Sequence, residues 1–138
     1  MSSYKTKVVG NVLFSYLSGE LDSELARQWV DQLEKEEASA GIVLHRFHDV
    51  RDVNAVHLSF DDLWSFAQRR MDTYVGNDAT KAAFWVSTPL NYGVSRMYQA
   101  LTDGTPFEIE VLYELDEIAD FLGVELTQLE NFSFDDEF

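Results

Sequence analysis

The sequence lacks cysteine, has only two prolines, and carries ten basic residues against twenty-five acidic ones. Without cysteine the chain has no disulfide, no thiolate nucleophile and no cysteine-bound metal cluster, and we expect a cytoplasmic protein. No run approaches the roughly 20 apolar residues of a membrane-spanning helix, so we expect no stable membrane insertion. The formal net charge of −15 argues against nucleic-acid binding, which needs Lys and Arg to neutralise phosphates.

The chain does have enough apolar sequence for one folded domain. Its 138 residues are 46% hydrophobic and 14% aromatic, and a domain commonly has roughly 100–150 residues. The charge is concentrated towards the C-terminus, because residues 97–138 carry twelve acidic side chains and no basic one. We expect part of this charge to form a solvated acidic edge that a basic partner would meet, made of Glu108, Glu110, Glu114, Asp116, Glu117 and Asp120.

Hydrophobic periodicity alternates between the two-residue repeat of strands and the 3.6-residue repeat of helices. Strands are predicted at residues 8–17 (one strand or a pair), 42–48, 81–87 and 107–113. Helices are predicted to begin at Asp22 or Ser23, at Ser59 and at Thr88-Pro89, with a last helix at Leu115–Leu122. The order βαβαβαβα predicts an α/β domain over residues 1–124, with a mainly parallel four- to five-stranded sheet and helices packed on it.

Several local patterns carry further structural expectations. The polar segment 49–57 is predicted to be a loop. The helix after Ser59 is expected to bury an apolar stripe of Phe60, Leu63, Trp64, Ala67, Met71 and Tyr74. The next helix is expected to bury Leu90, Val94, Met97, Tyr98 and Leu101, and Gly93 beside this face predicts a close approach of the helix to the sheet. Residues 125–138 form an acidic, aromatic-containing tail, either flexible or an arm that docks its aromatic rings on a neighbour or on its own body.

The pair His45 and His48 has the spacing of some metal ligands. On a strand, however, residues three apart point to opposite faces of the sheet. We therefore expect the two imidazoles to diverge, and we assign neither a metal site nor a cofactor.

The best candidate for a ligand pocket is the end of the strand predicted at 81–87. Ser87, Thr88 and Asn91 place hydroxyls, an amide and the free N–H groups of a helix start at the carboxyl end of a central strand. Ligands favour that edge in open α/β sheets, and helix N-termini attract anions. Arg96 lies one turn beyond Tyr92, where it would either bridge to Asp49 or another acidic residue at a strand end, or hold the anionic group of a ligand. The candidate ligand-binding residues are Asp49, Ser87, Thr88, Asn91, Tyr92 and Arg96.

No set of residues supplies the nucleophile, base and orienting group that an enzyme requires, so we assign no catalytic residue. The least implausible set would be Asp49, Ser87 and Arg96. Ser59 is read first as a helix cap with Asp62 three residues on. Phosphorylation of Ser59 is the regulatory alternative.

Several stretches of sequence resemble the SpoIIAA-like group of small bacterial proteins, which is related in fold to STAS domains and to CRAL-TRIO lipid-binding domains. They are His45-Arg46-Phe47-His48-Asp49, Leu58-Ser59-Phe60-Asp61-Asp62-Leu63 with Arg69-Arg70, Lys81-Ala82-Ala83-Phe84, Pro89 to Leu101, Phe107 to Val111 and Ala119 to Gly123. The segment from Tyr92 to Tyr98 is the most specific of these. The resemblance covers residues 8–124 and implies a SpoIIAA-like fold. Ser59 does not match the phosphoacceptor motif of STAS domains.

By this resemblance we expect a bacterial protein that acts as a non-catalytic STAS-like regulatory or protein-interaction module. The alternative is a carrier of a small apolar or amphipathic, lipid-like ligand. A carrier would need an apolar cavity that opens near residues 87–91, with Arg96 meeting an acidic head group. We also expect a homodimer.

Overall fold

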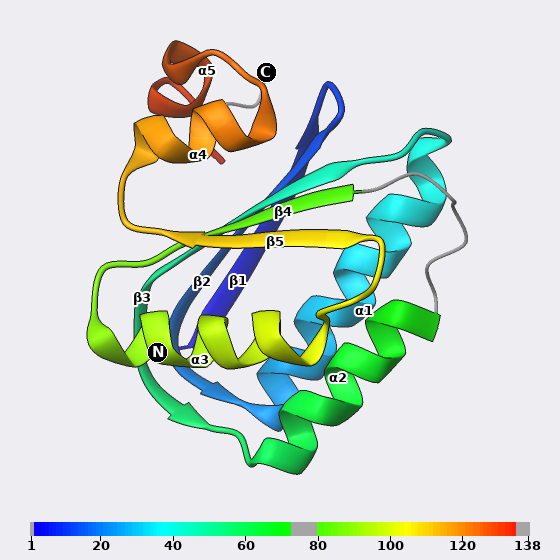
Figure 1. Cartoon of the computed structure of the whole chain (residues 1–138), viewed down its shortest axis with the longest axis vertical. Coiled ribbons are helices and arrows are strands. Elements are labelled where there is room, and N and C mark those ends of the chain that lie inside the picture. Colours follow the sequence, from blue (N-terminus) through cyan, green and yellow to red (C-terminus); the bar gives the residue numbers. More distant parts are fainter. Residues whose placement is uncertain (1, 73–79, 135–138) are drawn as a thin grey trace.

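Five strands form a single sheet in the order β1-β2-β3-β4-β5 in the computed structural model, which describes residues 2–72 and 80–134 (Figure 1). β1 pairs antiparallel with β2, and each following pair is parallel. The strands are β1 (Ser3–Val9), β2 (Val12–Asp22), β3 (His45–His57), β4 (Thr80–Trp85) and β5 (Phe107–Leu112). The predicted α/β class with a mainly parallel sheet is confirmed, and the first predicted strand is the β1–β2 pair.

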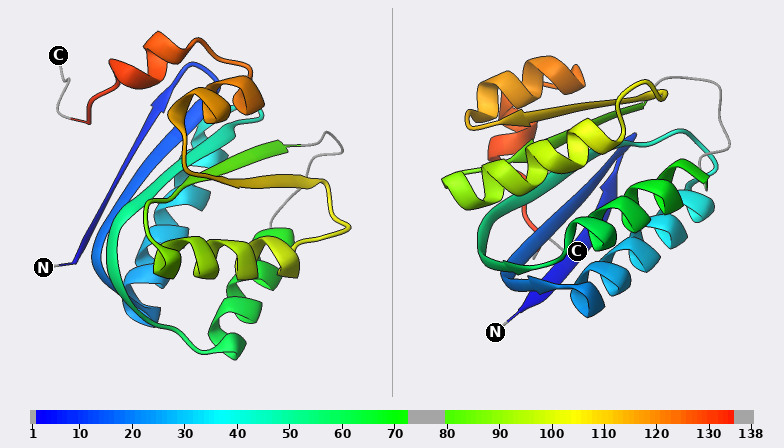
Figure 2. Two further views of the ribbon diagram at one scale, coloured as in Figure 1. Left: turned by 60° about the vertical axis from the view of Figure 1, so that its left-hand side comes forward. Right: turned by 60° about the horizontal axis from the view of Figure 1, so that its bottom comes forward.

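Helices cover both faces of this sheet (Figure 2). Each of the first three connects two neighbouring parallel strands and packs on the same face, as expected when every crossover has the same hand. The remaining two follow the last strand and cover the opposite face. The helices are α1 (Ser23–Ala40), α2 (Phe60–Asp72), α3 (Pro89–Leu101), α4 (Leu115–Leu122) and α5 (Leu126–Glu130).

The helix starts and ends follow the predicted local signals. The Asp22 carboxylate caps α1 by accepting a hydrogen bond from the Leu25 N–H at 2.8 Å. Ser59 and Asp62 cap α2 reciprocally, each accepting from the backbone N–H of the other. α4 stops at Gly123, whose φ of 74° is in the left-handed region that favours glycine. These capping residues fix where the helices begin and end.

The prediction of a loop at residues 49–57 is wrong, because this segment is the second half of β3. β4 pairs with β3 only from Arg46 to Asp49, whereas β2 pairs with it as far as His57. Beyond Asp49, β3 is therefore an edge strand that pairs with β2 alone, and much of it is exposed. Polar residues suit such a strand, and they gave it the composition of a loop.

The predicted apolar stripes of α2 and α3 are partly wrong. Phe60 and Trp64 face outwards and are 58% and 49% exposed, while α2 buries Leu63, Ala67 and Arg70 instead. Tyr74 lies outside the described residues. On α3, Leu90 and Met97 are exposed, and the buried residues are Asn91 and Ser95. Gly93 is also exposed, and a Cβ there would meet no atom within 4 Å, so it does not serve a close approach to the sheet.

The C-terminal segment docks its aromatic rings on the chain's own body. The ring of Phe132 stacks on Phe14 of β2 with centroids 3.9 Å apart, and Phe134 lies 6.4 Å from Tyr16. The Lys7 ammonium donates a hydrogen bond to the Ser133 carbonyl at 3.3 Å. The segment as far as Phe134 is thus an arm over the sheet, as one of the two sequence readings held.

The predicted acidic edge is confirmed, since all six of its carboxylates, from Glu108 to Asp120, are exposed. They lie on β5, on α4 and in the connection between them. Within residues 2–72 and 80–134, no helix combines the length and the apolar character needed to cross a bilayer.

Candidate functional site

The most developed site is a cavity of about 90 Å³ between the sheet and the three helices α1, α2 and α3. It exists because α2 packs mainly against α1 and α3, whereas α1 and α3 pack directly on strands. α2 therefore spans the space above the middle of the sheet as a roof. Close-packed interiors rarely leave voids larger than a water molecule, so a space of this size is a feature to be explained.

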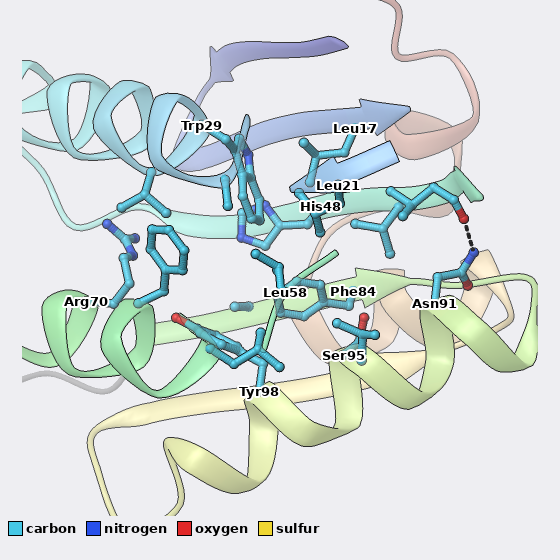
Figure 3. Close-up of a pocket in the computed structure, with 18 of the residues that line it drawn as sticks. Leu17, Leu21, Trp29, His48, Leu58, Arg70, Phe84, Asn91, Ser95 and Tyr98 are labelled. Atoms are coloured by element: carbon cyan, nitrogen blue, oxygen red, sulfur yellow. Dashed lines mark hydrogen bonds between the residues drawn. The ribbon is translucent and has the colours of Figure 1, made fainter. Parts of the chain in front are cut away.

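Most of the lining is apolar and comes from every layer around the space (Figure 3). Strands β2, β3 and β4 supply its floor and helices α1, α2 and α3 its walls and roof. Figure 3 shows Arg70 at one end of the lining and Asn91 at the opposite end. The apolar and aromatic part includes Leu17, Leu21, Trp29, Val50, Val53, Val56, Leu58, Phe66, Phe84 and Ile109.

α3 turns a polar stripe towards this apolar space. Asn91, Ser95 and Tyr98 follow one another at helical spacing, and all three line the cavity. Burial raises the pKa of the Tyr98 hydroxyl, although the nearby Arg70 and Arg46 oppose the rise, so this hydroxyl stays protonated at neutral pH. The helix therefore presents hydrogen-bonding groups where an ordinary core would have aliphatic ones.

His48 of β3 is a second buried polar group on the cavity wall and is 3% exposed. Its Nδ1 shares a hydrogen bond of 2.6 Å with the Ser15 hydroxyl, and its ring meets the edge of Trp29 at 5.1 Å. Burial lowers the pKa of His48 well below 6.5, assisted by the positive charges of Arg46 and Arg70. The imidazole is neutral at pH 7.

Two arginines close one end of the cavity, and both are almost fully buried. Arg46 of β3 is 8% exposed and Arg70 of α2 is 7% exposed. Arg70 binds the Glu37 carboxylate of α1 through two hydrogen bonds of 3.0 and 2.6 Å, and the Arg46 Nε donates to the same carboxylate. Buried arginines are uncommon unless they are paired. The Glu37 carboxylate is the partner that reduces the cost of burying these two.

Attraction between Glu37 and the two arginines offsets the cost of burying these charges. Burial opposes ionisation of Glu37, but hydrogen bonds and proximity to Arg70 and Arg46 outweigh it and lower the Glu37 pKa. Burial likewise opposes the charge on Arg70, and Glu37 more than offsets it, so the pKa of Arg70 is raised. Both ends of the ion pair are therefore charged near neutral pH.

Among the candidate residues from the sequence, Asn91 is the one that lines the cavity, and its side chain is engaged by its own chain. The Asn91 amide oxygen accepts from the N–H groups of Ser87 and Thr88 at 2.9 and 3.1 Å. Its amide nitrogen donates to the carbonyls of Arg51 and Val53 at 3.3 and 3.4 Å. Asn91 thus clamps the start of α3 to β3.

Ser87 and Thr88 lie on the surface beside this clamp. The Ser87 hydroxyl donates to the Arg51 carbonyl at 3.1 Å, and the Thr88 hydroxyl accepts from the Asn91 N–H at 3.2 Å. Both hydroxyls therefore serve the turn between β4 and α3. Neither lines the cavity.

The other candidates are not brought together with them. The exposed Arg96 donates to the Tyr92 hydroxyl one turn earlier at 2.8 Å, and Tyr92 stacks on Tyr113. Asp49 lies on the far face of the sheet, where it binds the Arg51 guanidinium at 3.0 Å. The expected bridge between Arg96 and Asp49 is wrong, because each has a partner of its own.

His45 and His48 diverge as predicted. His48 points into the cavity face, while the His45 Nδ1 accepts from the Lys81 N–H at 3.1 Å. Within residues 2–72 and 80–134, no group of three or more His, Asp or Glu side chains is placed to hold a metal ion. Ser59 is exposed and caps α2; its phosphorylation stays a prediction.

Sequence reasoning missed the residues that give the cavity its chemistry, namely Arg46, His48, Arg70 and Trp29 as a group. One signal was present: Arg46 and His48 alternate with apolar residues and so share the face that also carries Val50. A charged residue on the buried face of a strand is unusual enough to mark a site. The ion-pair partner of Arg46 lies on α1, and the sequence pattern does not show this.

No protein-family model matches this sequence, and no curated protein matches it. Among solved structures, the chain is similar to an uncharacterised protein of the DUF3478 family from Shewanella loihica PV-4, described as having a SpoIIAA-like fold. The two chains are 15% identical, the match covers 88% of this chain and 95% of that one, and the TM-score is 0.62. The likeness establishes the fold: this chain is an α/β domain of SpoIIAA-like fold.

Proposed function

We propose that this protein is a non-catalytic binding module that holds a small, largely apolar molecule beneath α2. The observation that carries the proposal is the cavity of about 90 Å³, lined by the sheet and three helices. Since one water molecule needs about 10–15 Å³ measured in this way, the space would admit roughly six to nine of them. A molecule with a similar number of non-hydrogen atoms would fit.

The composition of the wall supports binding rather than chemistry. Sites for small molecules are mostly apolar, with a few polar groups that set orientation, and this wall has that make-up. Asp49, Ser87 and Arg96, the set considered for catalysis, lie apart and outside the cavity. The proposal therefore favours the ligand-carrier alternative. The pocket lies in the space under α2, whereas it was expected at the start of α3, near residues 87–91.

The test is a titration of isotope-labelled protein with hexan-1-ol and with toluene, followed by amide chemical shifts. Both probes should shift resonances of lining residues such as Val50 and Phe84. Ser95→Leu, which adds apolar volume inside the cavity, should abolish these shifts. Ala100→Leu adds the same group on the exposed side of α3 and should leave them unchanged.

Two results would contradict the proposal. One is a wild-type protein in which neither probe moves a lining resonance at millimolar concentration. The other is a folded Ser95→Leu protein that binds as well as the wild type does. Native mass spectrometry of freshly purified protein complements the titration by weighing any molecule that the cavity retains.

A second candidate function is recognition of a protein partner, and it rests on the outer side of α2. Phe60 and Trp64 are one helical turn apart and both are about half exposed, and aromatic residues are enriched in protein interfaces. Asp61 and Asp62, in the first turn of the same helix, would suit a partner with basic residues around an apolar pocket. Because α2 also roofs the cavity, a bound molecule and such a partner would meet at the same helix.

This candidate is tested by affinity purification with wild-type protein and with the double variant Phe60→Ser, Trp64→Ser. A partner that binds through α2 should be lost with the double variant and retained by Val9→Ser, which removes an exposed apolar residue on β1. Sedimentation of the same proteins tests the expected homodimer. If the wild type is dimeric and the double variant monomeric, the occupant of this surface is a second copy of the chain.

A further inference from the structure

The polar groups around the cavity differ in how fully their hydrogen-bonding capacity is used. A guanidinium has five N–H donors and no acceptor. In Arg46, the Nε donates to Glu37 and one Nη donates to the Thr80 hydroxyl at 3.3 Å. Among the described residues, the second Nη of Arg46 has no hydrogen-bond acceptor, although the residue is only 8% exposed. Arg46 therefore brings an unused, charged donor to the cavity wall.

Other groups on the wall add to this surplus of donors. The Tyr98 hydroxyl lies beside Arg70, and among the described residues it has no acceptor for its own proton. The buried indole N–H of Trp29 has no acceptor among the described residues. Of these donors, the Trp29 N–H is the fully buried one without a partner among the described residues, and native structures keep few such groups. What the cavity has in excess are donors, so the complementary ligand group is an acceptor.

Among the described residues, the carboxylates near this end of the cavity are already engaged. Both oxygens of Glu37 accept from Arg70, and one of them also accepts from Arg46. Further out, Arg69 engages Glu34 and Asp31 at 2.7 and 2.6 Å. Arg27 joins this network through Asp31 and also pairs with Glu24. The network therefore holds four arginines and four carboxylates, so the inference rests on the unused donors of Arg46 and Tyr98 rather than on a net charge.

We propose that the molecule bound beneath α2 is a short-chain carboxylate, with its anionic group held by Arg46 and the Tyr98 hydroxyl and its apolar chain directed towards Asn91. Arg70, which shares the Glu37 carboxylate with Arg46, lies at one end of the lining and Asn91 at the opposite end (Figure 3). Guanidinium groups match the planar, two-oxygen geometry of a carboxylate. Hexanoate has eight non-hydrogen atoms, which lies within the roughly six to nine that the volume admits.

This inference rests on the proposed function and extends it by naming the ligand class. It differs from the sequence expectation, in which Arg96 met the acidic head group. Arg96 lies on the exposed side of α3 and lines no part of the cavity. Replacement of Arg46 should therefore weaken binding of the carboxylate, whereas replacement of Arg96 should not.

The experiment compares hexanoate with the uncharged hexan-1-ol and hexanamide, by chemical-shift titration of the full chain at constant pH and ionic strength. A charge-assisted hydrogen bond contributes more than a neutral one, so wild-type protein should bind hexanoate at least about tenfold more tightly than hexan-1-ol. Arg46→Met keeps the length and apolar character of the side chain and should reduce this ratio to about one. Arg27→Met, at an exposed arginine of α1, is the matched control and should leave the ratio unchanged.

The outcomes separate this inference from the proposed function. If hexan-1-ol and hexanoate bind equally to wild-type protein, the carboxylate is overturned and the apolar-ligand function stands; if neither binds, both fall. Loss of selectivity in Arg96→Met but not in Arg46→Met would also overturn it. Should Arg46→Met fail to fold, Tyr98→Phe removes one hydroxyl without changing the ring, and it should weaken hexanoate severalfold while sparing hexan-1-ol.

Discussion

Replacement of Asn91 by alanine distinguishes between two roles of this residue. The sequence predicts that it contacts a ligand, whereas the structure shows that it clamps the start of α3 to β3. The side chain makes four hydrogen bonds to its own chain, two accepted at 2.9 and 3.1 Å and two donated at 3.3 and 3.4 Å. It is 2% exposed, so water would not replace these partners fully. The clamp role therefore predicts a large loss of stability.

The magnitude follows from the four bonds. Each well-formed hydrogen bond contributes about 1 kcal/mol net, and the two longer ones about half of that, giving a loss of about 3 kcal/mol for Asn91→Ala. For a domain of this size, 1 kcal/mol corresponds to roughly 3–5 °C in Tm, so the variant should melt about 10–15 °C below the wild type. Urea unfolding monitored by tryptophan fluorescence gives the free energy directly.

The control is Asn11→Ala in the turn between β1 and β2, where the asparagine is exposed; its stability should stay within about 0.5 kcal/mol of the wild type. The reasoning is refuted if Asn91→Ala unfolds within about 1 kcal/mol of the wild type. If the folded variant instead loses hexan-1-ol binding at unchanged stability, Asn91 is a ligand residue, as predicted from the sequence.

Two further predictions concern stability. Folded His48 keeps its pKa well below 6.5 because it is buried, so below about pH 6.5 the unfolded chain binds a proton that the folded chain does not. The free energy of unfolding should therefore fall towards acidic pH by at most about 1.4 kcal/mol per pH unit. His48→Asn should flatten this pH dependence, as measured by urea titrations between pH 7 and 5. An unchanged slope in the variant would show that another group causes the pH dependence. Gly93→Ala should stabilise the protein by about 0.5–1 kcal/mol, since Gly93 lies within a helix with open space around it, and a destabilised variant would contradict that geometry.

The elements that could be predicted from the sequence are those whose signals are local. Thr88-Pro89 marks the start of α3 and Gly123 the end of α4, because caps and left-handed glycines act within a few residues. The alternation of strands and helices then fixes a parallel sheet. The second half of β3 was predicted to be a loop because it is polar and exposed. Its exposure arises because β4 stops pairing with β3 at Asp49, and the residues of β3 alone do not show where the neighbouring strand ends.

The site could not be predicted in the same way, because its residues meet across long separations. Arg70 is buried only because Glu37, 33 residues earlier, supplies a carboxylate on the neighbouring helix. Hydrophobic periodicity alone predicted that Phe60 and Trp64 are buried on the inner face of α2, and it gave no reason to bury an arginine there. Asn91 was chosen as a ligand-binding candidate at the start of α3, but its four hydrogen-bond partners, which give it a structural role, lie on two other segments.

The two faces of the sheet are completed at different times during synthesis. Helices α1, α2 and α3 are made between the strands that they cover, whereas α4 and α5, which cover Phe14 and Phe47, follow the last strand. As the chain leaves the ribosome N-terminus first, one side of the sheet can close early while the other keeps an uncovered apolar surface until residues beyond Leu115 emerge. A chain interrupted after Leu112 would carry every strand and still expose that surface, so translation that stalls there should yield aggregates, and chaperone demand should peak in the last moments of synthesis.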